Sequence, residues 1–198
     1  MRRQPNRYQT FSRIALCAAT LVAASAIRSR AAERFDQLRG WYDDDTGDAL
    51  PIVSWRGSDG DFAAELFITD NAPSFVAAWS AASQSNGPDL PEIQTVAPGH
   101  DLTAYIIYAG CGILVPTCNA TADFKLVRPD HKVYAAINKF PLASKGPHRP
   151  KLLYLARGGF TFQFDPKDRQ GLYKLYATVR DPDTGKSLAL HRIIELRP

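Results

Sequence analysis

The second half of the chain alternates apolar and polar residues. In "FTFQF" (160–164) the three phenylalanines fall on one face of an extended backbone, and the threonine and glutamine fall on the other. The segments "ADFKLV" (122–127) and "LYKLYATVR" (172–180) repeat this alternation. A period of two is typical of a strand that buries one face and exposes the other. The pattern therefore predicts a half-buried β-strand in each of these segments.

A further run is apolar on both faces, and turn residues separate the runs. "LTAYIIYA" (102–109) has no polar face, which is typical of a strand in the centre of a sheet or under a covering segment. Turns rich in proline and aspartate follow at 128–131, 165–168 and 181–185, and the last joins its flanking runs as a hairpin. Short strands, regular turns and the lack of a long helical pattern predict a mainly β fold, an antiparallel β-sandwich with one short docked helix.

The short helix is predicted before residue 100. Asp70-Asn71-Ala72-Pro73 offers a capping side-chain oxygen followed by a proline near the first turn. Phe75, Val76 and Trp79 then recur at helical spacing, which predicts a helix that docks on the sandwich. Trp79 could stack on a ligand, but a role in docking the helix is the favoured interpretation. The preceding run 61–69, "DFAAELFIT", predicts a strand.

The N-terminal residues have a different composition from the rest of the chain. Residues 1–13 carry four arginines and no acid, and residues 14–27 contain no charge. This is the pattern of a secretory signal, and the apolar run is shorter than the roughly 20 residues of a membrane-spanning helix. We therefore expect a signal peptide at 1–31, an extended N-terminal segment at 32–60 and a β-sandwich domain at 61–198. An uncleaved amphipathic anchor is the alternative for the N-terminus.

Removal of such a signal peptide would reverse the net charge. The chain has 24 basic and 20 acidic residues, a net charge of +4, but six of the arginines and none of the acids lie in 1–31. Residues 32–198 thus hold 18 basic and 20 acidic residues, so we expect no nucleic-acid partner. The charge is also unevenly distributed, since residues 36–123 carry 13 acids and two bases, and residues 124–198 carry 15 bases and six acids.

Two cysteines, Cys111 and Cys118, remain outside the signal-like segment. In an oxidising compartment two thiols that bracket a short loop most simply form a disulfide, and we predict this bond. Free thiols and a metal site are the alternatives. A structural zinc needs four Cys or His ligands, and the histidines have no suitable spacing to either cysteine. A disulfide and a signal peptide together predict a periplasmic or secreted protein.

The segment Asp168–Tyr173, "DRQGLY", opens the run that ends at Asp181. It resembles the tyrosine corner of immunoglobulin and fibronectin III sandwiches, in which a tyrosine hydroxyl bonds to the backbone at a crossing between sheets. The spacing between Asp168 and Gly171 is one residue longer than in the tighter form of this motif. The resemblance implies a structural role for Tyr173.

Three features together carry a wider resemblance: the Phe75-x₃-Trp79 helix, the cysteine loop followed by "ADFKLVRPDHK" (122–132), and "DRQGLYKLYATVRDPDTGKSLAL" (168–190). With these features the chain after about residue 60 resembles a group of small exported proteobacterial proteins with a single Ig-like, fibronectin III-like β-sandwich. It departs from them at His131, where such turns usually carry glycine after Pro-Asp. The resemblance implies the fold and the compartment, and it implies no active-site residues.

The sequence contains none of the motifs that mark common catalytic sites. G-x-S-x-G, H-E-x-x-H and a glycine-rich phosphate loop are all absent. "WYDDDTGDAL" (41–50) gathers four aspartates, but counted from Asp43 its glycine falls at position five of a calcium loop that needs glycine at position six. A solvated acidic loop is therefore favoured there. We predict no enzyme activity, no metal site and no cofactor.

The segment 139–157, "KFPLASKGPHRPKLLYLAR", is a long, basic connection, which we name the basic connection. Long loops on rigid scaffolds are where binding tends to reside. Its candidate binding residues are Lys139, Lys145, Arg149, Lys151, Tyr154 and Arg157. A solvated loop without a partner is the alternative.

These observations support three functional hypotheses in order of preference. The first is a non-enzymatic periplasmic binding or assembly module whose basic connection contacts an envelope protein or an anionic envelope component. The second is a structural accessory subunit of an envelope complex, held by residues 33–60. The third is a hydrolase or metal-dependent enzyme, which would require at least two histidines to converge from the set His100, His131, His148 and His191.

Overall fold

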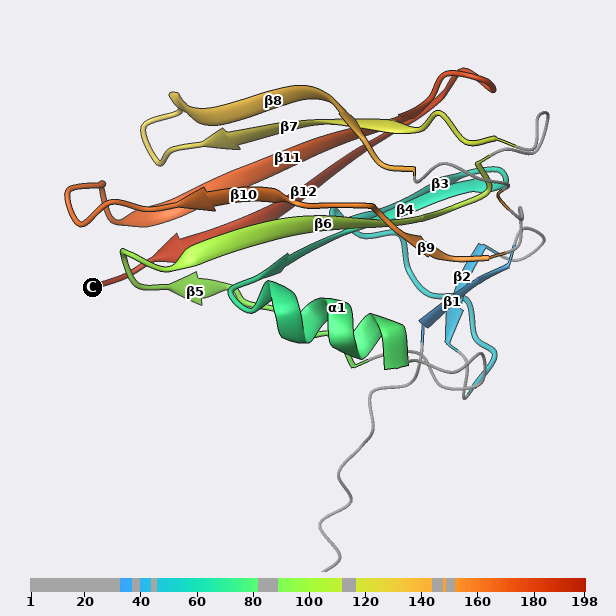
Figure 1. Ribbon diagram of the computed structural model, residues 1–198, viewed down its shortest axis with the longest axis horizontal. Coiled ribbons are helices and arrows are strands. Elements are labelled where there is room, and N and C mark those ends of the chain that lie inside the picture. The colour runs from blue at the N-terminus through green and yellow to red at the C-terminus, as the bar shows by residue number, and fades with distance from the viewer. Residues whose placement is uncertain are drawn as a thin grey trace, which may run out of the picture.

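The computed structural model describes residues 33–36, 40–43, 46–81, 89–111, 117–143, 148 and 152–198. The described chain forms two packed β-sheets with one short helix against them (Figure 1). The predicted mainly β sandwich is therefore confirmed. The predicted signal peptide at 1–31 lies outside the described residues. Within the described ranges, no helix combines the length and the apolar character needed to cross a membrane.

The first sheet has the strand order β10-β6-β4-β3, and the short strand β9 also pairs with β6. Its strands are β3 (Arg56–Asp59), β4 (Phe62–Thr69), β6 (Asp101–Ala109), β9 (Tyr154–Leu155) and β10 (Phe160–Gln163). All neighbours are antiparallel. Every residue of β6 except Asp101 is buried. The predicted central strand is thus confirmed, because β6 has neighbouring strands along both edges.

The second sheet has the strand order β5-β12-β11-β7-β8. Its strands are β5 (Thr95–Val96), β7 (Thr121–Val127), β8 (Val133–Pro141), β11 (Gly171–Asp181) and β12 (Lys186–Leu196). β5 is parallel to β12, and the other pairs are antiparallel. The predicted hairpin is confirmed by the unbroken pairing of β11 with β12. The neighbours β12, β11 and β7 match the G, F and C strands of an immunoglobulin-like sandwich.

The core lies between the two sheets and takes alternate residues from each strand. In β11 and β12 the inward positions are buried and the outward ones are mostly exposed, as the period of two predicts. The largest fully buried side chains come from both sheets and include Phe62, Tyr108, Phe124, Phe164 and Tyr173. Burial of these aromatic rings stabilises the fold, because the free energy gained scales with the apolar area removed from water.

Tyr173 closes the crossing from the first sheet to the second between β10 and β11. Its ring centroid lies 4.4 Å from that of Phe164, and its hydroxyl donates to the carbonyl oxygen of Arg169 at 2.9 Å. Asp168 fixes the same turn, since its Oδ2 accepts from the hydroxyl of Tyr134 at 2.6 Å and from the backbone N–H of Asp165 at 2.7 Å. The predicted tyrosine corner is confirmed by the bond from the Tyr173 hydroxyl to backbone.

The helix α1 (Ala72–Ala81) begins and docks as predicted. The side chain of Asn71 accepts from the backbone N–H of Ser74 at 3.0 Å, which is a helix N-cap. Phe75 is fully buried, and its ring stacks on Tyr105 of β6 with centroids 4.8 Å apart. Trp79 is half-buried, so Phe75 is the main docking residue. α1 covers part of the outer face of the first sheet (Figure 1).

The segment 32–60 contributes both to a hairpin and to the sandwich. β1 (Glu33–Asp36) and β2 (Gly40–Asp43) pair with each other, and β3 joins the first sheet beside β4. Trp41 is buried against Ala63 and Ala109 on the outer face of the first sheet, and its indole N–H donates to the carbonyl oxygen of Gly57 at 3.2 Å. "RGSD" has no apolar alternation, so its strand was not visible in the sequence.

Candidate functional site

The structure describes three of the six predicted binding residues. Lys139 is exposed near the end of β8, and Arg157 is exposed after β9. Tyr154 lies in β9 and is half-buried. Lys145, Arg149 and Lys151 lie outside the described residues.

The two ends of the basic connection are hydrogen-bonded to each other and to the sandwich. The backbone N–H of Arg157 donates to the carbonyl oxygen of Leu142 at 2.9 Å, which closes the base of the loop. Leu142 N–H donates to Ala120 O at 3.0 Å, and Ala156 N–H donates to Ile106 O at 2.8 Å. Because one of these bonds reaches β6 and another reaches the start of β7, the connection is fixed to both sheets.

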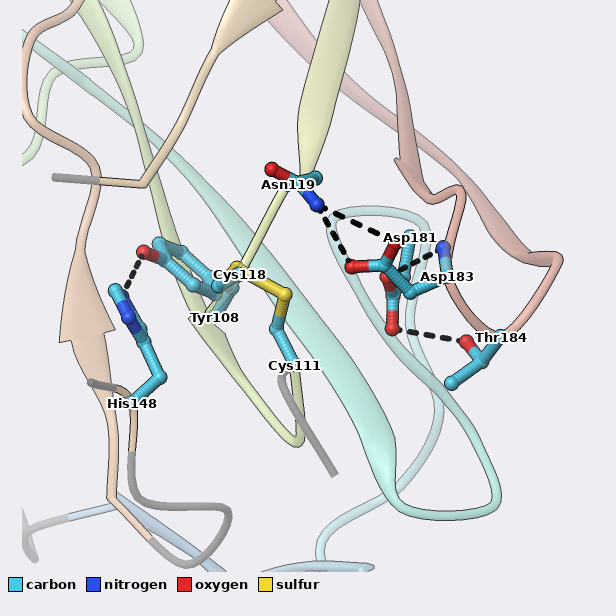
Figure 2. Close-up of a disulfide and its surroundings, with 8 residues drawn as sticks. All are labelled: Tyr108, Cys111, Cys118, Asn119, His148, Asp181, Asp183 and Thr184. Atoms are coloured by element: carbon cyan, nitrogen blue, oxygen red, sulfur yellow. Dashed lines mark hydrogen bonds between the residues drawn. A yellow bond between two sulfur atoms is a disulfide. The ribbon is translucent and has the colours of Figure 1, made fainter. Parts of the chain in front are cut away.

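His148 attaches the middle of the basic connection to the first sheet. It is buried, and its Nε2 lies 3.1 Å from the hydroxyl of Tyr108 in β6 (Figure 2). The ring of Tyr154 lies 4.4 Å from His148 and 5.9 Å from Tyr108, centroid to centroid. Burial, and secondarily the neighbouring Tyr154, raise the pKa of Tyr108, so this hydroxyl stays protonated at neutral pH.

His148 is a residue whose role the sequence did not indicate. It was visible only as one of four scattered histidines, and its partner Tyr108 lies 40 residues away in the chain. Tyr154 was assigned to binding, and in the structure its ring belongs to the cluster around His148. The exposed charges of Lys139 and Arg157 thus stand at the ends of a connection whose described residues are fixed at the base and at His148.

The predicted disulfide between Cys111 and Cys118 is confirmed, with a Cα–Cα distance of 5.3 Å (Figure 2). It ties the end of β6 to the chain that enters β7, and both cysteines are buried. Gly110 allows the turn into this loop, since its φ is +75° and a Cβ there would lie 1.6 Å from the carbonyl oxygen of Asp61. The disulfide and the His148 cluster lie at the same end of the sandwich (Figure 2).

The β11–β12 turn is also fixed at this end of the molecule. Asp181 is fully buried, and its carboxylate accepts from the backbone N–H of Asp183 at 3.1 Å and from the hydroxyl of Thr184 at 2.9 Å. Asn119, next to the disulfide, donates to the carboxylate of Asp183 at 3.0 Å (Figure 2). These bonds connect the chain that follows Cys118 to the β11–β12 turn.

Lys139 has a backbone role as well as an exposed charge. It adopts a left-handed conformation, φ 53°, at a register irregularity between β7 and β8. Its N–H donates to Oδ1 of Asp123 at 2.7 Å, and Arg180 forms an ion pair with the same carboxylate. The Lys139 bond and, next, the Arg180 bond hold the pKa of Asp123 below its ordinary value of 3.8.

The fold sorts charge between the two layers. The strands of the first sheet carry one basic residue, Arg56, and three acidic residues, Asp59, Glu65 and Asp101. The strands of the second sheet carry three acidic residues and six basic ones, namely Lys125, Lys139, Lys174, Arg180, Lys186 and Arg192. The charge asymmetry along the sequence is thus retained in space, because each half of the chain supplies most of one sheet.

The four histidines have different surroundings. His100 and His131 are exposed in turns, His148 is buried in the tyrosine cluster, and His191 lies on the outward side of β12 beside Tyr176. In the part of the chain that the structure describes, no three side chains of the His, Cys, Asp or Glu type come together to hold a metal ion.

No family model and no curated protein matches the chain. Among solved structures it is similar to a family 123 glycoside hydrolase from Clostridium perfringens, with a TM-score of 0.39 and 10% identity over 68% of this chain. The chain spans 27% of that hydrolase. It is also similar to an AA10 lytic polysaccharide monooxygenase from Streptomyces lividans, with a TM-score of 0.24, 14% identity, and coverage of 73% of this chain and 83% of that one. TM-scores in this range carry no argument about function.

Proposed function

We propose that the protein is a non-enzymatic binding or assembly module of the bacterial periplasm that presents its basic connection to an anionic envelope component. The observation that carries this proposal is the attachment of the connection. Its base is closed by the bond from Arg157 to Leu142, and its middle is held by the buried His148. The exposed charges of Lys139 and Arg157 therefore belong to a connection that is attached to the sandwich at its described residues.

Such attachment matters because binding restricts loop motion. A loop fixed before binding loses less conformational entropy, so more of the attraction between opposite charges appears as affinity. The exposed side chains of Lys139 and Arg157 lie near the two ends of the connection, which places positive charge on both sides of its base. An anionic partner is the complement of such a surface.

The disulfide supports an extracytoplasmic location. Disulfides persist in oxidising compartments such as the periplasm and are rare in the cytosol. The Cys111–Cys118 bond crosslinks the end of β6 to the chain that enters β7, which suits a stable module exposed to the envelope. The signal-like N-terminus supports the same location.

Co-purification from native envelope extract tests the proposal. A variant with Lys145→Glu, Arg149→Glu, Lys151→Glu and Arg157→Glu should recover the wild-type partner about tenfold less well, because several charge contacts become repulsive. Recovery by the wild type should also fall as salt is raised. Mass spectrometry of the recovered material is the measurement.

A matched control is offered by the exposed turn between β10 and β11. Lys167→Glu and Arg169→Glu change basic residues away from the connection and should leave recovery unchanged. Recovery that is indifferent to salt, or equal for the connection variant and the control, would contradict the proposed function.

A further inference from the structure

The outer faces of the two sheets differ in how they are covered. α1 and Trp41 lie on the outer face of the first sheet (Figure 1). On the outer face of the second sheet, no helix or strand within the described ranges lies over β7, β11 and β12 (Figure 1). Apolar side chains are nevertheless exposed there, with Leu172 at 57%, Ile193 at 48% and Tyr176 at 36% exposure. A concentration of exposed apolar residues is a mark of an interaction site.

The strand register brings these residues together. Lys125, Tyr176 and His191 are direct neighbours in a row across β7, β11 and β12. Val127, Lys174 and Ile193 form the next row, about 7 Å along the strands, and Leu172 pairs with Glu195 in the row after that. We name this surface the Tyr176 face and define it by Lys125, Val127, Leu172, Lys174, Tyr176, His191 and Ile193.

Lys125 and Lys174 give the Tyr176 face positive charge, and the two acids beside it in the strand register, Asp123 and Glu195, are paired with Arg180 and Arg197. The ammonium groups of Lys125 and Lys174 lie 5.3 and 5.5 Å from the centroid of the Tyr176 ring, which is cation–π geometry. Elsewhere on this sheet Lys186 is paired with Asp61. Neither Lys125 nor Lys174 has a carboxylate within ion-pair distance among the residues that the structure describes.

His191 adds no charge at neutral pH. Burial and, secondarily, the nearby Lys174 lower the pKa of His191, so its ring is neutral beside Tyr176. The face therefore combines two unpaired cations with apolar and aromatic side chains. A partner that complements it must supply both carboxylates and apolar contact.

Three kinds of anionic partner can be compared with this requirement: a lipid surface, a polysaccharide and a protein. The first two meet only part of it. A lipid surface would require apolar groups to reach about 5–10 Å into the membrane boundary, and Leu172 and Ile193 stand on a flat sheet among longer lysines. A polysaccharide would gain little from the exposed side chains of Leu172 and Ile193, because its own surface is strongly hydrated. A protein surface supplies carboxylates and apolar side chains together, so a protein fits the face best.

We propose that the Tyr176 face is a docking surface for a protein that presents apolar side chains flanked by Asp or Glu. This surface is separate from the basic connection, so the proposal goes beyond the proposed function. β7, β11 and β12 span about 10 Å across and about 25 Å along, an area of a few hundred Å². A stable complex buries about 800 Å² on each partner, so we expect a transient interaction in the micromolar range.

Peptide selection tests the proposal with a defined probe. Peptides from a random displayed library are selected on the disulfide-bonded protein, and their affinities are measured by titration. The selected peptides should place Asp or Glu beside Leu, Ile or Phe. Affinity should fall about tenfold for Lys125→Glu with Lys174→Glu, and about tenfold for Leu172→Ser with Ile193→Ser. All four residues lie on the outward side of the sheet, and circular dichroism would check that the fold is kept.

The controls separate this surface from the basic connection. Lys167→Glu with Arg169→Glu, and Arg157→Glu, should bind the selected peptides like the wild type. Peptides that lack acidic residues, or that bind the Tyr176-face variants undiminished, overturn the proposal. Binding of anionic vesicles or polygalacturonate that depends on Lys125 and Lys174, without any peptide binding, overturns it as well. If envelope recovery is lost in the basic-connection variant while the selected peptides bind the Tyr176-face variants undiminished, the proposed function stands and this proposal is refuted.

Discussion

At the scale of single residues, backbone conformation bears on the position at which the chain departs from the group of proteins it resembles. His131 stands after Pro-Asp in the β7–β8 turn with φ 65°, a left-handed conformation that favours glycine. The turn is closed by bonds from the His131 N–H to the Arg128 carbonyl at 2.9 Å and from the Arg128 N–H to the Lys132 carbonyl at 2.8 Å. These two hydrogen bonds thus keep the turn closed although the backbone of His131 is strained.

His131→Gly should raise the free energy of unfolding by about 0.5–1 kcal/mol, because glycine removes the left-handed penalty and loses only part of that gain to chain entropy. The exposed imidazole contributes no burial that would oppose the change. Denaturant unfolding measures the effect. Lys132→Gly is the control, since Lys132 has no positive φ, and it should destabilise; stabilisation by both variants would refute the conformational explanation.

The pKa of Asp123 predicts a pH dependence. Because the bonds from Lys139 and Arg180 lower this pKa in the folded state, the carboxylate stabilises the fold above its ordinary value of 3.8, and that stability is lost as the pH falls through this region and below. Asp123→Asn should therefore reduce stability at pH 7 by about 1 kcal/mol. The difference from the wild type should shrink toward zero in acid.

Denaturant unfolding of both proteins over a series of pH values checks this prediction. Asp130→Asn, in the β7–β8 turn, provides a comparison in which the carboxylate does not bond to Lys139 or Arg180. A stability difference for Asp123→Asn that is the same in acid and at neutral pH would show that the bonds to the charged carboxylate are not its cause.

At the scale of elements, three contacts link the strands of one sheet to the strands of the other. The disulfide ties β6 to β7, the tyrosine corner ties β10 to β11, and the base of the basic connection ties β8 to β9. Each joins segments that leave one sheet and enter the other. These are the positions at which a sandwich would otherwise open.

Removal of the disulfide should destabilise the protein without changing its fold. For a loop this short, Cys111→Ala with Cys118→Ala should lower the free energy of unfolding by about 2 kcal/mol, chiefly by giving the unfolded chain more freedom. Chemical denaturation measures the loss. The wild type in reductant should match the variant, and a variant as stable as the oxidised wild type would contradict a stabilising role.

At the scale of the whole molecule, the two outer faces have different covers and different charge. The first sheet is covered by α1 and by Trp41, and its strands are mostly acidic in charge. The second sheet carries most of the strand cations and exposes the Tyr176 face. Both surfaces proposed for binding are built from residues after 124, the basic part of the sequence, with Cys111–Cys118 bracing the end where the connection attaches.

Trp41→Ala tests whether the N-terminal hairpin stabilises the first sheet by packing on its outer face. The indole is buried against Ala63 and Ala109 and bonded to Gly57, so its loss should cost about 3 kcal/mol of unfolding free energy. Thermal unfolding measures the change. Trp79→Ala removes a tryptophan that is only half-buried and should cost less. No measurable loss for Trp41→Ala would show that the N-terminal hairpin does not stabilise the sheet.

Sequence reasoning succeeded where the signal is local. The alternation in 172–180 repeats the pleat of a strand, Asn71 before Pro73 marks a helix start, and two cysteines seven positions apart are close by connectivity alone. It missed β3, because "RGSD" pairs with β4 through its backbone and carries no alternating apolar side chains. It also gave His148 no partner, since Tyr108 becomes its neighbour only through the fold.

By itself the sequence determined the strands that have an alternating or continuous apolar pattern, the cap of the helix, the disulfide and the uneven charge, since each depends on residues near one another in the chain. Only the tertiary structure decided that Lys125, Tyr176 and His191 form one row, because strand register joins positions far apart in sequence. It likewise decided that the basic connection is closed at its base and held by His148. Both results depend on which strands pair, and pairing is settled by burial of the whole core rather than by any one segment.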